Sequence, residues 1–574
     1  MKLLKLVLAS GLALTLIAGC GAAKKDGQLI STVHFKEGTA EKEFDKFYAS
    51  YISEMEPAYR EDNLAYFNAS INNTKENWDI FAEKDKRMNA ILSNKAKFDT
   101  VKAFKISREI TNPLKKRQIE VLYNEFMAYQ INPTESNKLT DMNAAIEGKY
   151  SAFRAKVDGK QMSDNEVENV LLTSKNDNEL KQVWLAQKEL GRLVSADIIA
   201  LVKQRNKIAH ELGYENWHTM SLVRNEQDPK DIEKLFDELD KLTAPAFARE
   251  KARMDSVLAM QLGIKKQDLM PWHYQNRFFQ EAPNIYSTDL DKYFANKNII
   301  DIVKEYYRSL GLPIDEMVAN SDLYEKPGKN QHAYCINIDR NAKDIRVLCN
   351  IKNNDYWLST LLHEFGHALY EKHYAEDLPW NLKNAACIFT TEGVAMMFER
   401  FTSSPKWLVE VAGIPQADAD LLSENLHKTL VLKQLVFSRF VQVMYRFEKS
   451  MYANPDQDLN KLWWDLVEKY QLLKKPVGRN EPDWATKIHI ATSPCYYHNY
   501  LMGELFASQL HYSLAKSIGC SGDDDLSFKG QKAIGKFMID KVFAPGMRYK
   551  WNDMIKKATG EKLTPKYYAK QFVN

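Results

Sequence analysis

The chain has 574 residues, of which 45% are hydrophobic, and its formal net charge at pH 7 is +3. This length and hydrophobic content suffice for a large buried core, and they exclude an intrinsically disordered protein. The near balance of acidic and basic residues excludes the strongly basic surface of a nucleic-acid-binding protein, so we expect no nucleic acid among its partners.

The N-terminus has the pattern of an export signal. Two lysines precede an apolar run, residues 6–18, which is short for a membrane span and ends in the letters LIAGC. This ending resembles a bacterial lipoprotein signal, in which cleavage leaves Cys20 lipidated. We therefore expect a signal peptide over 1–19, a lipid anchor and tether over 20–35, and a protein bound to the cell envelope that faces the periplasm. An ordinary secretory signal with an incidental cysteine is the alternative.

Most of the chain after the tether has helical periodicity. Apolar residues recur at helical spacing over 44–52 and again over 183–194. The 18 prolines and 23 glycines are few for this length, which favours long helices over a β-sandwich. The sequence therefore predicts a mainly α fold, and no segment after the signal has the pattern of a membrane-spanning helix.

One short stretch departs from this pattern. Residues 332–338 and 345–351 are both β-prone, and a polar turn separates them, so we predict a small β-hairpin. Cys335 and Cys349 flank the turn and could face each other, either as a disulfide or as two thiols.

The motif HExxH occupies His363 to His367. The surrounding pattern predicts a helix over 354–370, capped by Asn353 or Asn354. Because residues four apart lie on one face of a helix, both imidazoles can reach one metal ion. Glu364 projects beside them, where it can take a proton from the attacking water. The alternative is a helix that carries two exposed histidines without a metal.

Zinc needs a third protein ligand, and the sequence offers two candidates. His373 stands where metzincins have their third histidine, but Tyr370 replaces the glycine that would turn the chain back. In a continuing helix, His373 lies about 9 Å further along the axis than His367 and on another face. Glu392, 25 residues after His367 on a second helix, is the better candidate and defines a gluzincin, although the helix dipole alone also favours a glutamate there. We predict one Zn²⁺ per chain, held by His363, His367 and Glu392.

A second group of polar and aromatic side chains comprises Lys487, His489, Tyr497 and Tyr500. Peptide hydrolysis creates an oxyanion, which a tyrosine hydroxyl and an imidazole N–H can stabilise in a dry cleft. A lysine can bind a substrate carboxylate as a point charge. Aromatic clusters are more often parts of a core, so this group alone is a weak signal.

Taken together, these motifs resemble the angiotensin-converting-enzyme (peptidyl-dipeptidase A) family, in a bacterial form. The sequence HEFGH and Glu392 match the metal site of that family. The pair His332-Ala333, 31 residues before His363, is similar to the family's substrate-binding strand. The tract 463–471, and the lysine, histidine and two tyrosines of the second group, also match.

The resemblance implies one catalytic domain over residues 36–574, an almost wholly helical, two-lobed ellipsoid with a deep central channel and a small β-hairpin near the active site. It implies a zinc peptidase that releases dipeptides from the C-termini of oligopeptides. It also implies residue roles. Glu364 would be the general base, and His332 and Ala333 would pair with the substrate backbone. Lys487 and Tyr497 would hold the substrate carboxylate, and His489 and Tyr500 would stabilise the oxyanion.

The chain departs from the family pattern in two places that concern the site. Tyr274 stands where the family has a glutamine that helps bind the substrate carboxylate, and Gln275 is one position late. Met396 replaces an aspartate four residues after the glutamate ligand, so the hydrogen-bond partner of one zinc histidine is unassigned.

Two other functions compete with the dipeptidase. The first is an endo-acting oligopeptidase that resembles the thimet oligopeptidase family, which shares HExxH, the later glutamate and a late His…Tyr-x-x-Tyr. The second is a lipid-anchored peptide-binding protein that has lost catalysis. Against the second, every residue type that the chemistry needs is present.

Overall fold

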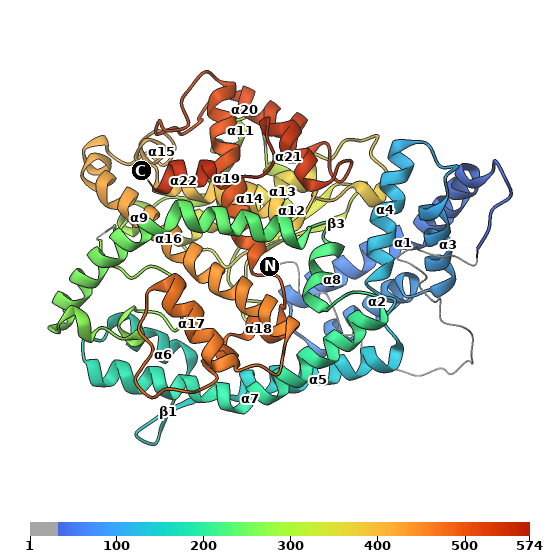
Figure 1. Ribbon diagram of the computed structural model, residues 1–574. Coiled ribbons are helices and arrows are strands. Elements are labelled where there is room, and N and C mark those ends of the chain that lie inside the picture. The colour runs from blue at the N-terminus through green and yellow to red at the C-terminus, as the bar shows by residue number, and fades with distance from the viewer. Residues whose placement is uncertain (1–32, 287, 574) are drawn as a thin grey trace. The chain divides into compact units, whose positions relative to one another are not determined.

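The computed structural model describes residues 33–286 and 288–573. The predicted signal peptide over 1–19, Cys20 and most of the tether over 20–35 lie outside the described residues. The described chain is mainly helical (Figure 1), as the sequence predicts. No helix in this part of the chain combines the length and the apolar character that crossing a membrane requires. The chain divides into two compact units, and each is described by itself.

The first unit combines residues 33–137, 294–399 and 528–562 among those that the structure describes. Its named elements are α1 (Ala40–Ile71), α2 (Lys75–Leu92), α3 (Lys95–Ile106), α4 (Pro113–Met127), α11 (Ile299–Ser309), α12 (Asp315–Asn320), β3 (Tyr334–Asp339), β4 (Asp344–Leu348), α13 (Asp355–Lys372), α14 (Ile388–Glu399), α20 (Lys532–Phe537) and α21 (Trp551–Thr559). Polar side chains cap α2, α3 and α4: Thr74, Asn94 and Asn112 each accept a hydrogen bond from a backbone N–H of the first turn.

The second unit combines residues 138–293, 400–527 and 563–574. Its named elements are β1 (Ala155–Val157), β2 (Lys160–Met162), α6 (Asp164–Thr173), α7 (Asp177–Glu211), α8 (Trp217–Arg224), α9 (Pro229–Leu262), α15 (Pro405–Glu410), α16 (Gln416–Ala453), α17 (Leu459–Gln471), α18 (Ile488–Thr492), α19 (His498–Ser517) and α22 (Lys566–Phe572). Two further helices, α5 (Pro133–Ala152) and α10 (Asp291–Phe294), cross a boundary between the units.

The predicted hairpin is present in the first unit. Strands β3 and β4 pair antiparallel, with Cys335 opposite Val347. The turn forms where Asp339 accepts hydrogen bonds from two following backbone N–H groups and Lys343 adopts a φ of 55°. Cys349, one residue beyond β4, is a buried free thiol, so no disulfide joins it to Cys335.

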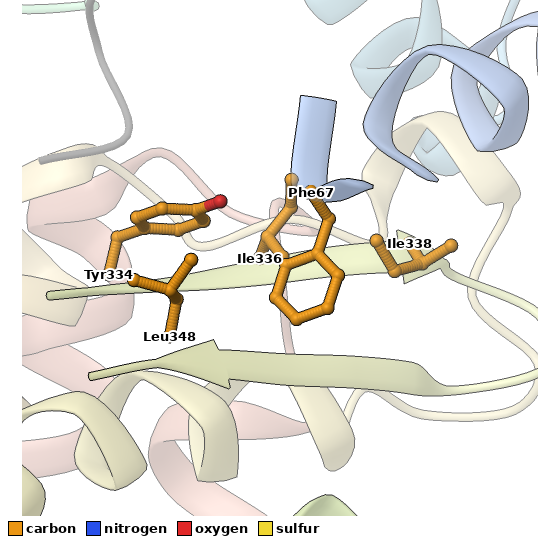
Figure 2. Close-up of a cluster of buried hydrophobic side chains, with 5 residues drawn as sticks. All are labelled: Phe67, Tyr334, Ile336, Ile338 and Leu348. Carbon is orange, nitrogen blue, oxygen red and sulfur yellow. The ribbon is translucent and has the colours of Figure 1, made fainter. Parts of the chain in front are cut away.

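One face of this hairpin packs against α1 (Figure 2). Phe67 of α1 covers side chains that alternate along β3, together with one from β4; these are Tyr334, Ile336, Ile338 and Leu348. All five are at most 4% exposed. This apolar layer fixes the strand that follows the predicted substrate-binding pair.

A second hairpin, β1 and β2, was not predicted. Each of its strands has only three residues, which is too short for a clear alternation of apolar and polar side chains. Asp158 and Gly159, with φ of 49° and 80°, form its turn. An Asp-Gly pair is a strong signal for such a turn, and that signal could have located the hairpin.

Candidate metal centre

The two motif histidines lie on α13, which begins and ends close to the predicted limits. The side chain of Asn354 accepts a hydrogen bond from the backbone N–H of Trp357 and caps the helix. One turn separates His363 from His367, and their Nε2 atoms are 3.2 Å apart. The helix thus presents two imidazoles to one point, as the motif predicts.

Glu392 reaches the same point from α14. Its Oε2 lies 3.6 Å from His363 Nε2 and 3.8 Å from His367 Nε2. The two helices pack closely because Gly366 has no side chain, and a Cβ there would lie 2.9 Å from the Cα of Ala395. The glycine of HEFGH therefore sets the approach of the helix that carries the carboxylate.

These three side chains fit a zinc ion. Their ligand atoms all lie within 4.8 Å of one another. Zinc bonds to nitrogen and oxygen of about 2.0–2.2 Å separate tetrahedral ligand atoms by about 3.3–3.5 Å, close to the three separations given above. Two imidazoles and one carboxylate leave a fourth position open, which is the donor set of a catalytic zinc site.

The other candidate ligand, His373, is not part of this group. Because α13 ends at Lys372, His373 occupies the C-terminal cap position. Its Nδ1 lies 2.9 Å from the carbonyl oxygen of Leu369, and its ring packs 5.9 Å from the ring of Phe543, centroid to centroid. His373 therefore stabilises the end of the helix.

Glu364 is buried beside the histidines, and its side chain is not one of the grouped ligands. Its Oε2 has no hydrogen-bond partner among the described residues. Burial raises the pKa of this carboxyl group, although the nearby charge of His363 opposes the shift. This oxygen is therefore free of partners within the part of the chain that the structure describes and can accept a hydrogen bond from water.

The far nitrogens of both histidines have partners that the sequence analysis missed. His363 Nδ1 lies 2.9 Å from Glu399 Oε2, and His367 Nδ1 lies 2.7 Å from Thr391 Oγ1. Burial lowers the pKa of His363, but the hydrogen bond and charge of Glu399, with the charges of two other glutamates, raise it to about 9. Glu399 follows Glu392 by two helical turns, and this spacing is the signal that could have located it.

His332 and Ala333 immediately precede β3. His332 is exposed and Ala333 is half-buried. Upstream, the buried ammonium group of Lys329 donates to a carboxylate oxygen of Asp322 at 2.6 Å and to the carbonyl oxygen of Cys349. This buried lysine ties the segment before β3 to the end of β4. In a two-stranded sheet, β3 pairs with β4 along one edge only, and its other edge is where a peptide strand could add.

The second group of predicted residues lies within the second unit. The ammonium group of Lys487 is surrounded by the rings of Phe278, Phe440 and Tyr497, with Nζ 5.1 Å from the Tyr497 centroid. Its Nζ donates a hydrogen bond to Gln280 Oε1. Burial lowers the pKa of Lys487 to about 7.

Gln280 is a further residue that the sequence analysis missed. The hydroxyl of Tyr274 instead donates to Asp255 and lies 2.7 Å from Lys251 Nζ, inside the unit's core. Gln275 Oε1 accepts a hydrogen bond from the backbone N–H of Asn284. Tyr274 and Gln275 thus bond to other residues, and Gln280, six residues after Tyr274, accepts the hydrogen bond from Lys487.

His489 and Tyr500 adjoin this cluster. The ring of Tyr497 lies 5.2 Å from the ring of His489 and 5.4 Å from that of Tyr500, centroid to centroid. Burial, and to a smaller extent the charge of Lys487, lowers the pKa of His489 to about 3. The imidazole is therefore neutral at pH 7, and its Nδ1 has no hydrogen-bond partner among the described residues.

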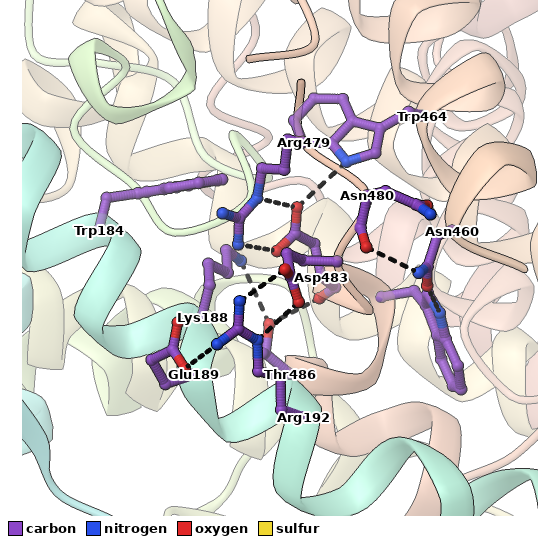
Figure 3. A network of polar contacts seen from close by, with 12 residues as sticks. Trp184, Lys188, Glu189, Arg192, Asn460, Trp464, Arg479, Asn480, Asp483 and Thr486 are labelled. Atoms are coloured by element: carbon purple, nitrogen blue, oxygen red, sulfur yellow. Dashed lines mark hydrogen bonds and ion pairs between the residues drawn. The ribbon is translucent and has the colours of Figure 1, made fainter. Parts of the chain in front are cut away.

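A polar network holds the segment that leads to Lys487 (Figure 3). The guanidinium group of Arg479 binds both carboxylate oxygens of Asp483, and Trp464 Nε1 donates to the same carboxylate at 3.1 Å. From α7, Lys188 donates to the hydroxyl of Thr486 at 3.2 Å. Lys487 therefore follows a segment that is held by several hydrogen bonds and one ion pair.

The sequence is similar to that of known proteins over most of its length. The family model described as angiotensin-converting enzyme (Peptidase M2) matches residues 38–567. Angiotensin-converting enzyme from Mesocricetus auratus is 24% identical over 560 residues, which cover 91% of this chain and 42% of that protein. The enzyme from Theromyzon tessulatum is 22% identical over 569 residues, which cover 92% of this chain and 90% of that protein.

A third relative, the angiotensin-converting enzyme-like protein Ace3 from Mus musculus, is 23% identical over 428 residues, which cover 69% of this chain and 57% of that protein. The chain therefore spans about two-fifths of the Mesocricetus relative and nine-tenths of the Theromyzon relative. Because the family model matches nearly all of the described residues, the chain belongs to the angiotensin-converting-enzyme family of metallopeptidases.

Proposed function

We propose that this protein is a zinc peptidase that cleaves oligopeptides and releases dipeptides from their C-termini. The observation that carries the proposal is the convergence of His363, His367 and Glu392 at the spacing of tetrahedral zinc ligands. Family membership supports the reaction class. The donor set and the buried carboxylate beside it support hydrolysis over simple peptide binding.

Glu364 is the proposed general base. His363, His367 and Glu392 would hold a zinc ion, which would supply polarisation of the scissile carbonyl and a lower pKa for the attacking water. Glu364 accepts the proton of that water and later delivers it to the leaving amine. Its Oε2 makes no competing hydrogen bond among the described residues, which supports this assignment.

The remaining roles rest on the family resemblance and on the chemistry of the side chains. Tyr500 and His489 stabilise the oxyanion, and the neutral state of His489 supports a role as an N–H donor. Lys487 and Tyr497 bind the substrate C-terminus, and the amide of Gln280 stands beside that lysine. A lysine among aromatic rings suits a substrate carboxylate, since the low-dielectric surroundings strengthen the attraction between charges.

His332 and Ala333 are the residues that we propose pair with the substrate backbone. Because they directly precede β3, a bound peptide can extend the sheet by one strand and use its own backbone groups for the hydrogen bonds. In this mode of recognition, the hydrogen bonds involve the peptide backbone and do not depend on the side chains of the peptide. Oligopeptides of varied sequence are therefore the proposed substrates.

A peptide with an amidated C-terminus tests the dipeptidase assignment. We expect amidation to lower kcat/KM by roughly 10- to 100-fold, because it removes the charged partner of Lys487. Steady-state kinetics on a matched pair of peptides, with the products identified by mass spectrometry, measures this ratio. An endo-acting oligopeptidase would instead cut both peptides at similar rates and at internal bonds, and that result would overturn the dipeptidase assignment.

We also propose, from the sequence of residues 1–20 alone, that the protein is exported and attached to the bacterial cell envelope by lipid on Cys20. This attachment would place the peptidase where external or periplasmic oligopeptides reach it.

A further inference from the structure

Each of the two histidines uses its second ring nitrogen for a hydrogen bond to α14. Glu399 contacts Nδ1 of His363 through a carboxylate oxygen, and Thr391 contacts Nδ1 of His367 through its hydroxyl. In both rings Nε2 is the atom near Glu392. One helix thus supplies a ligand and both of the groups that fix the imidazoles.

The order of these contacts follows from opposed helix directions. The earlier histidine on α13 contacts the later residue on α14, and the later histidine contacts the earlier one. The two histidines are separated by about 6 Å along their helix, whereas Thr391 and Glu399 are separated by about 12 Å along theirs. The short threonine side chain bonds next to Glu392, and the long glutamate side chain spans the remaining distance.

The two contacts differ in charge. The Glu399 side chain is 30% exposed and the His363 side chain is 20% exposed, so the carboxylate is only partly screened by water. A carboxylate that accepts the Nδ1–H of an imidazole holds the tautomer whose Nε2 lone pair binds metal, and it makes that nitrogen more basic. A hydroxyl can accept the same N–H without adding charge, but it can also donate, so it orients the ring without selecting the tautomer. Met396, one turn before Glu399, cannot serve because a thioether is a weak acceptor.

We propose that Glu399 is a positioning residue for the metal centre, which orients His363 and strengthens its bond to zinc, and that Thr391 orients His367. The proposal rests on the proposed function, because it assumes a metal at this group. Glu399 is not one of the three grouped ligand residues, and it would act through the imidazole of His363. The expected consequence is a lower affinity for zinc when its carboxylate is removed, typically by 10- to 100-fold.

The experiment measures zinc affinity on the full chain, and not only the activity of the loaded enzyme. The protein is stripped with a chelator, and the Kd for Zn²⁺ is determined by competition with a chromophoric chelator for the wild type, Glu399→Leu, Glu399→Gln and Thr391→Val. Glu371→Gln is the matched control, since Glu371 is also a carboxylate of the first unit, on α13, and accepts its hydrogen bond from Asn337. The thermal midpoint of each metal-free protein and the visible spectrum of each Co²⁺-loaded protein complete the set.

We expect Glu399→Leu to raise the zinc Kd by roughly 10- to 100-fold and to change the Co²⁺ spectrum. Glu399→Gln should fall between the wild type and Glu399→Leu, because an amide oxygen still accepts the N–H but carries no charge. Thr391→Val should raise the Kd less than Glu399→Leu does. Glu371→Gln should bind zinc like the wild type.

This set of variants distinguishes failure of the proposed function from failure of the proposed role of Glu399. If the wild type binds no zinc, the proposed function itself is wrong. If the wild type binds zinc and Glu399→Leu binds it within twofold of the wild type, the positioning role of Glu399 is overturned. If Glu399→Leu fails to fold, Glu399→Gln decides, because it keeps the size of the side chain, and an unchanged Kd and Co²⁺ spectrum in that variant would again overturn the role.

Discussion

Replacing Glu364 by glutamine is expected to lower kcat by roughly 10²- to 10⁴-fold while the protein keeps its zinc. Glutamine has nearly the same shape as glutamate but cannot accept a proton from water at neutral pH. Glu364 is not among the grouped ligand residues, and its Oε2 makes no hydrogen bond among the described residues, so the change removes little else. Removing a buried carboxyl group whose pKa is raised by burial should also leave folding stability intact.

Steady-state kinetics on an oligopeptide, combined with elemental analysis of zinc, measures both parts of this expectation. Glu376→Gln is a suitable control, because that exposed carboxylate pairs with Lys343 on the surface of the same unit. Retention of more than a tenth of wild-type kcat would show that Glu364 is not the base. Loss of zinc together with activity would show instead that Glu364 helps to hold the metal.

The second large effect is expected at Tyr500. Tyr500→Phe should lower kcat by roughly 10²-fold or more with little change in KM. The reason is that the negative charge on the carbonyl oxygen develops in the transition state and is absent from the bound substrate. The phenyl ring remains, so the edge-to-face contact between this ring and Tyr497 is preserved. The change therefore isolates the hydroxyl.

Tyr496→Phe is the matched control for that variant, since Tyr496 belongs to the same segment and its ring lies 5.1 Å from that of Tyr500, centroid to centroid. It should leave kcat within a few-fold of the wild type. A Tyr500→Phe enzyme whose KM rises as much as its kcat falls would argue for a role in substrate binding or in folding. An unchanged kcat would remove Tyr500 from the reaction.

The grouping of His363, His367 and Glu392 could be predicted because two of these residues follow from local periodicity. A helix sets the spacing of His363 and His367 without help from the rest of the fold. The choice of Glu392 over His373 also depended on a local property, the continuation of a helix through Tyr370. The structure adds the reason for the close packing, which is the missing side chain of Gly366 against α14.

The contacts that sequence reasoning missed depend on how distant segments meet. Matching Tyr274 and Gln275 to the family's glutamine assumes an unchanged path of the backbone. In the structure, Gln275 and Phe279 both adopt left-handed backbone conformations, with φ of 56° and 51°, and the chain turns so that Gln280 faces Lys487. Glu399 was missed because the family resemblance places the acceptor at position 396, where this chain has Met396. The carboxylate that contacts His363 lies one turn later on the same helix.

A single zinc ion between His363, His367 and Glu392 is the assignment on which every proposed catalytic role depends. Anomalous diffraction at the zinc absorption edge, from crystals of the full chain supplied with one equivalent of zinc, locates that ion. We expect one peak per chain, about 2.0–2.2 Å from one nitrogen of each imidazole and from a carboxylate oxygen of Glu392. A peak beside His373, or a peak bonded to the two imidazoles with the Glu392 carboxylate turned away, would contradict the assignment and the mechanism built on it.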